Sequence, residues 1–85
     1  SNIGSLAVNE NLTYTGNGSI TNALQVAQDK TLTIQNNGTL SFNSTKGSVN
    51  NAGTIAGNLA NVKDSIITSF NNSGTITGDL YNEGH

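Results

Sequence analysis

Cysteine, proline, methionine and tryptophan are absent from this 85-residue chain, and charged residues make up only 9% of it. Without cysteine, the chain can form neither a disulfide framework nor a thiolate metal site. Its three basic residues are all lysines, which are too few for the positive surface that binds nucleic acid. No apolar run approaches the ~18 residues of a membrane-spanning helix, so we expect no membrane insertion by this segment.

Small polar residues supply most of the chain. Asn, Thr, Gly and Ser account for more than half of the residues, whereas Leu, Ile, Val and Phe number 20 of 85. A compact domain of this size buries only ~60–65% of the surface of its unfolded chain, which leaves little scope for a conventional core. Stacked repeats offer another solution, because neighbouring units share one continuous core and each unit needs few apolar residues.

A repeated motif favours this second solution. Four segments share a glycine with a large apolar residue four positions before it and another two positions after it. The glycines are Gly18, Gly38, Gly53 and Gly74, and the apolar pairs are Tyr14 and Ile20, Ile34 and Leu40, Val49 and Ile55, and Phe70 and Ile76. Residues 48–61 and 69–82 also align beyond the motif. We interpret residues 1–85 as a single repeat-built fragment of a longer extracellular protein, with units centred on the four glycines.

The local chemistry of the repeats indicates an all-β fold. Apolar and polar residues alternate in 12–14, 32–34 and 40–42. Each motif glycine suits a turn, where it supplies a positive φ. Residues 23–30 could form a helical turn, whereas the β-branched segment 65–70 favours a strand.

Two arrangements of such strands fit the motif. In an antiparallel β-meander, Tyr14 would face Ile20 across a hairpin whose loop ends in Gly18. In a parallel β-solenoid of about four coils, the glycine segment forms a corner and both flanking apolar residues point inward. We favour the solenoid, because a recurrence near 20 residues suits a three-sided coil of short strands. A trimeric fibre, in which three chains share the core, is a further alternative.

The solenoid interpretation predicts how the core is stacked. One stack would contain Ile20, Leu40, Ile55 and Ile76, and a second would contain Tyr14, Ile34, Val49 and Phe70. Asparagine side chains are expected to stack at the corners, as amides do in other cross-β assemblies. The ends of the stack would expose unpaired strand edges, so we also expect self-association through the solenoid ends.

Three segments resemble the β-solenoid passenger regions of bacterial autotransporters and related secreted adhesins: NAGTIAGNL at 51–59, NSGTITGDLYN at 72–82 and QDKTLTIQNNGTL at 28–40. The resemblance covers residues 11–84. It implies secretion or display on the bacterial cell surface, with outer-membrane anchoring through parts outside this segment. It also implies a role in cell adhesion and virulence, with a host-cell or matrix surface as partner.

Residues suited to catalysis do not cluster in the sequence. The single histidine is His85, the last residue, and Asp79 and Glu83 are most simply solvated turn residues. We therefore expect a non-enzymatic segment, without cofactor or metal, that acts as a rigid stalk or binding surface. The alternatives are a polysaccharide-acting β-helix, a trimeric phage tail-fibre segment, or an ice-binding β-helix, since Thr or Ser follows every motif glycine as in the Thr-x-Thr faces of ice-binding solenoids.

Overall fold

The computed structural model describes residues 2–35 and 38–85, and all regular elements among them are β-strands. The strands are β1 (Asn2–Val8), β2 (Leu12–Thr15), β3 (Gly18–Val26), β4 (Thr31–Gln35), β5 (Thr39–Phe42), β6 (Gly47–Asn51), β7 (Thr54–Ala56), β8 (Asn58–Asn61), β9 (Ile67–Asn72), β10 (Thr75–Ile76) and β11 (Leu80–Asn82). Every pairing between them is parallel. This confirms the predicted parallel β-solenoid of about four coils, and it excludes the antiparallel meander.

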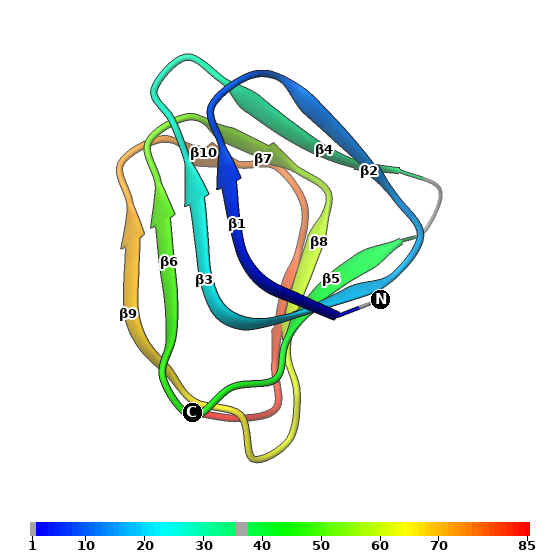
Figure 1. The fold of residues 1–85 in the computed structure, drawn as a ribbon, viewed down its shortest axis with the longest axis vertical. Coiled ribbons are helices and arrows are strands. Elements are labelled where there is room, and N and C mark those ends of the chain that lie inside the picture. Colours follow the sequence, from blue (N-terminus) through cyan, green and yellow to red (C-terminus); the bar gives the residue numbers. More distant parts are fainter. Residues whose placement is uncertain (1, 36–37) are drawn as a thin grey trace.

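Each coil has three walls, which Figure 1 shows as the three sides of the coil outline. Wall A contains β5, β8 and β11 together with residues 18–20 of β3 and residues 2–3 of β1. Wall B contains β6, β9, residues 23–26 of β3 and residues 5–8 of β1. Wall C contains β2, β4, β7 and β10. The long strand β3 therefore bends around the corner between walls A and B.

Alternating apolar and polar residues determine which side chains enter the interior. In β5, the buried Leu40 and Phe42 alternate with the half-buried Thr39 and Ser41. This is the two-residue period of a β-strand, whose successive side chains point to opposite faces. In β3 the alternation is interrupted at the exposed Thr21 and Asn22 and resumes from Leu24 to Val26, so the segment that could have been a helical turn begins as a strand. The predicted strand at 65–70 is present as β9, displaced by two residues.

The interior is a stack of apolar side chains. Its buried members are Val8, Ile20, Leu24, Val26, Leu32, Ile34, Leu40, Phe42, Val49, Ile55 and Leu59. Tyr14 and Ile76, which the sequence placed in the core, are partly buried and pack against this cluster. Phe70 differs from the prediction, since 38% of its surface is exposed. It lies on β9, which pairs with β6 on one side only.

The stacking partners also differ from the two predicted stacks. Ile55 does stack on Ile76, Tyr14 on Ile34 and Val49 on Phe70. However, the first two pairs lie on wall C and the third lies on wall B. On wall A, Ile20 stacks on Phe42 and not on Leu40. The cause is that the motif marks more than one kind of corner. Gly18 and Gly38 lie where the chain passes from wall C to wall A, whereas Gly53 and Gly74 lie between walls B and C.

The motif glycines are required for close packing and not for a positive φ, which corrects the turn prediction. Among the described residues, positive φ occurs at Gly16, Gly57, Asp29 and Asp64. At Gly53, a Cβ atom would collide with the carbonyl oxygens of Ala27 and Lys30, and at Gly74 it would collide with the Gly53 carbonyl. At Gly18 it would strike the Tyr14 ring, and at Gly38 the Gly16 carbonyl. At Gly38, Gly53 and Gly74 the corners thus stack backbone on backbone, which only glycine permits, whereas the neighbour of Gly18 is the end of the Tyr14 side chain.

Candidate functional site

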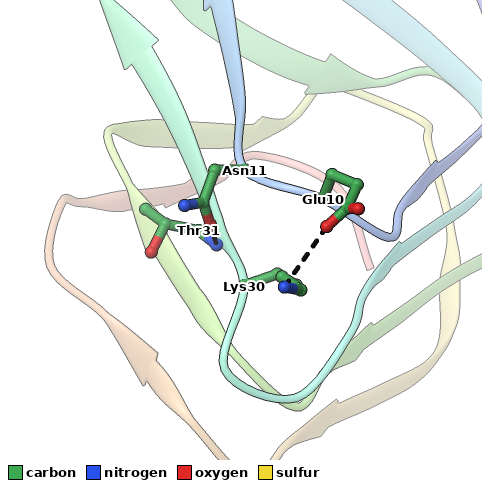
Figure 2. Close-up of polar contacts among 4 residues, drawn as sticks. All are labelled: Glu10, Asn11, Lys30 and Thr31. Atoms are coloured by element: carbon green, nitrogen blue, oxygen red, sulfur yellow. Dashed lines mark hydrogen bonds and ion pairs between the residues drawn. The ribbon is translucent and has the colours of Figure 1, made fainter.

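Exposed corner asparagines connect successive coils through their side-chain carbonyls. The Thr31 amide donates to Asn11 Oδ1 at 3.0 Å, and the Asp79 amide donates to Asn58 Oδ1 at 3.0 Å. The amide of Thr39 likewise donates to Asn17 Oδ1 at 2.9 Å. Figure 2 shows Asn11 directed at Thr31 in this way. Part of the asparagine content is therefore structural, because these oxygens satisfy backbone groups that strand pairing leaves over.

Two buried asparagines begin amide ladders inside the solenoid. Asn51 Nδ2 donates to Asn72 Oδ1 at 2.9 Å and to the Thr75 carbonyl at 3.0 Å. Asn61 Nδ2 donates to Asn82 Oδ1 at 3.0 Å and to backbone carbonyls of the next corner. Both Asn51 and Asn61 are at most 1% exposed. These contacts agree with the expectation that asparagines stack at corners.

On the outer surface, in-register pairing arranges polar side chains in rows. Wall B carries the exposed amide row Gln25, Asn50 and Asn71, and beside it the hydroxyl pair Ser48 and Ser69. Neighbouring members of a row are separated by the strand spacing of ~4.8 Å. These rows present hydrogen-bond donors and acceptors with no formal charge.

Wall C carries a second set of rows, made of threonine. One row contains Thr31, Thr54 and Thr75, which pair directly across β4, β7 and β10. A second row begins with Thr13 and Thr33 and continues to Ala56. The sequence motif had grouped Ser19 and Thr39 with Thr54, but Ser19 pairs with Ser41 and Thr39 with Asn58 on wall A. The missed signal was the Thr-Leu-Thr segment at 31–33, which lies before a motif glycine and not after one.

Charged side chains are sparse and lie at the periphery. Lys30 Nζ is 3.2 Å from Glu10 Oε1, and the two side chains are 37% and 84% exposed, as Figure 2 shows at the corner beside Asn11. An exposed pair of this kind contributes ~0–1 kcal/mol to stability. Tyr81 Oη donates to Asp79 Oδ2 at 3.2 Å, and this hydrogen bond together with the carboxylate charge raises the pKa of Tyr81.

The described residues contain no group of three or more His, Cys, Asp or Glu side chains that could hold a metal ion. Asp64 occupies a left-handed turn position. His85 contributes its backbone, which donates to the Ser65 carbonyl and accepts from the Ile67 amide. No helix within residues 2–35 and 38–85 is long and apolar enough to cross a membrane.

Comparisons with protein-family models, with curated proteins and with solved structures found no match.

Proposed function

We propose that this chain is a non-enzymatic structural and adhesive segment of a bacterial surface-displayed or secreted adhesin. The observation that best supports the proposal is the exposed row of Gln25, Asn50 and Asn71 on wall B. Because parallel in-register strands fix the backbone of this row, the spacing of its amides is set before any ligand binds, which lowers the entropic cost of binding. The resemblance of 28–40, 51–59 and 72–82 to autotransporter passenger regions supports the extracellular setting.

The chemistry of wall B suits a neutral polar partner. Amides and hydroxyls donate and accept hydrogen bonds without needing an oppositely charged ligand. The chain has a net charge of only −2 and three lysines, so long-range electrostatic attraction contributes little. We infer that wall B binds a glycan chain or the glycosylated surface of a host cell or matrix protein.

A glycan and matrix-protein binding array tests the proposal. We expect binding that changes little between low and high salt, because screening affects charged contacts most. The double variant Ser69→Lys/Asn71→Lys on wall B should weaken the interaction at least tenfold. The matched variant Thr75→Lys/Thr77→Lys places the same charges on wall C of the same coil and should bind normally. Absence of binding to every array member, loss of binding only in the wall C variant, or turnover of a bound polysaccharide would each contradict the proposal.

A second candidate function, ice binding, is favoured by one observation on wall C. Two parallel rows hold Thr31, Thr54 and Thr75 in one and Thr13 and Thr33 in the other. Each threonine presents a hydroxyl and a methyl group, at ~4.8 Å between coils and ~6.6 Å along a strand. Such a regular array can hold ordered water molecules.

Thermal hysteresis and ice recrystallisation in a cooled solution test this second function. If the protein binds ice, the variant Thr54→Lys, at the middle of one threonine row, should show no thermal hysteresis. The variant Asn50→Lys, at the middle of the wall B row, should keep it. Hysteresis that is absent, or that is lost equally in both variants, would remove ice binding from consideration.

A further inference from the structure

The C-terminal end of the stack is apolar and hollowed. Phe70 and Leu80 are 38% and 45% exposed there, although the residues stacked beneath them, Val49 and Leu59, are fully buried. A hollow of about 260 Å³ opens at this end, and it is lined by Asn61, Ile67, Phe70, Leu80, Asn82 and His85. The strands β9, β10 and β11 each pair on one side only. We call this surface the C-terminal end face.

Both amide ladders reach the end face with an unused donor. Within each ladder, the side-chain carbonyl of the outer asparagine accepts from the preceding coil, as Asn72 does from Asn51 and Asn82 from Asn61. Among the described residues, the Nδ2 groups of Asn72 and Asn82 donate to no protein atom. Asn51 and Asn61 use the same Nδ2 group for the next asparagine and for a backbone carbonyl at the next corner.

We propose that the C-terminal end face binds a further solenoid coil that carries asparagine in register with Asn72 and Asn82. The occupant would place apolar side chains over Phe70 and Leu80, as Phe70 and Leu80 themselves cover Val49 and Leu59. The contact continues the interface between successive coils that the chain already contains. It rests on the stalk part of the proposed function, because a stalk grows by adding coils.

A second copy of this chain, which the exposed strand edges led us to expect at the solenoid ends, is a poorer occupant. The N-terminal coil of a second copy would present Ile3 opposite Asn82 and Val8 opposite Asn72, as the wall A and wall B registers show. An apolar side chain accepts no hydrogen bond, so both amide donors would lack the asparagine acceptor that Asn51 and Asn61 have in the next coil. The end face therefore selects among coils by the residues at two corner positions.

The test adds one coil to the chain. A second copy of residues 65–85 is joined directly after His85, which keeps the 21-residue offset between Asn51 and Asn72 and between Asn61 and Asn82. The matched variant carries Asn72→Leu and Asn82→Leu in the added copy only, with similar side-chain volume and greater hydrophobicity. We expect the asparagine-bearing extension to raise the melting temperature by ~5 °C or more, and the leucine-bearing extension to raise it less.

Side-chain amide hydrogen exchange provides a second readout. In the asparagine-bearing extension, the amide protons of the original Asn72 and Asn82 should become protected like those of Asn51 and Asn61, and in the leucine-bearing extension they should stay fast. Equal or greater stabilisation by leucine, or unchanged exchange in both, would overturn the inference. So would tight head-to-tail oligomers of the unextended chain in sedimentation experiments. None of these readouts involves a glycan, so failure of the adhesive proposal leaves them unaffected.

Discussion

The N-terminal and C-terminal coils differ in the inward residue that directly precedes a corner on walls A and B. On wall B this residue is Val8 and Val26 in the first two coils, but Asn51 and Asn72 in the next two. On wall A, Ile20 and Phe42 are followed by Asn61 and Asn82. The same backbone position thus accepts either an apolar stack or an amide ladder. The ladder has an added role, because its Nδ2 groups also bind corner carbonyls.

The change from one chemistry to the other leaves two polar atoms without partners. Asn51 Oδ1 and Asn61 Oδ1 are buried, and they accept no hydrogen bond from the described residues. Their neighbours in the preceding coil are Val26 and Phe42, which have no side-chain donor. A buried unsatisfied acceptor costs ~1–3 kcal/mol. The boundary between the two halves is therefore the weakest point of both ladders.

The largest loss of stability is expected from a substitution on wall C, where the N-terminal and C-terminal coils share the same apolar chemistry. The wall C stack of Leu12, Leu32, Ile55 and Ile76 is apolar in every coil. Ile55→Asp places a charge in its fully buried centre, which should cost ~4 kcal/mol or more and abolish cooperative unfolding in circular dichroism. The outward neighbour provides the control, since Thr54→Asp should change stability by only ~0.5 kcal/mol. Similar behaviour of the two variants would disprove the inward and outward assignment.

A ladder residue should give the next largest effect. Asn51→Leu removes the donor to Asn72 Oδ1 and to the Thr75 carbonyl. We expect a loss of ~1–3 kcal/mol in chemical denaturation, because polar groups lose their partner while the apolar gain is partial. Asn50→Leu, one residue away on the outer surface, is the matched control and should be nearly neutral. If Asn51→Leu stabilises the protein, the two corner chemistries are interchangeable and the ladder contributes nothing.

A double-mutant cycle across the boundary gives a smaller but sharper effect. Val26→Asn should provide a donor for Asn51 Oδ1, at the cost of one apolar side chain. In the Asn51→Leu background the same substitution gains no such partner, so it should be more destabilising. We expect a coupling free energy of ~1 kcal/mol between positions 26 and 51 from equilibrium unfolding. A coupling energy of zero would mean that the orphaned Asn51 oxygen is satisfied in another way.

Sequence patterns were sufficient to predict the class of fold, but they did not predict which core residues stack on one another. Alternation in 40–42 and the recurrence of the glycine motif predicted strands and coils correctly. The motif could not reveal which corner it marked, because the corner from wall C to wall A and the corner from wall B to wall C both place a glycine between two inward apolar residues. The interval of 15 residues between Gly38 and Gly53 is the consequence, since the first glycine leads into wall A and the second into wall C.

The candidate site was less accessible to sequence reasoning. The rows on walls B and C join residues that lie 20 to 25 positions apart, such as Thr13 with Thr33 and Gln25 with Asn50. Because the offset changes from coil to coil with corner length, a single repeat period cannot predict the rows. The pairing register is needed first, and it is determined by packing inside the solenoid.

The smallest expected effect concerns Tyr81 on the outer surface of the last coil, which differs from its counterparts in earlier coils. Tyr81 pairs with Ala60, which pairs with Ser41, so Tyr81 is the only titratable side chain of this outward row. The hydrogen bond to Asp79, with the charge of that carboxylate, raises the pKa of Tyr81 above its ordinary value of 10.0. The stabilisation is therefore complete below pH 10 and is lost as the pH rises through the folded-state pKa.

In an ultraviolet titration of the phenol, Asp79→Asn should lower the pKa of Tyr81 toward 10.0, while Asp64→Asn, at the corner between walls A and B, should leave it unchanged. Since the pair is exposed, its effect on unfolding should lie near the limit of detection, and a titration unaffected by Asp79→Asn would show that Tyr81 is solvated like any surface phenol.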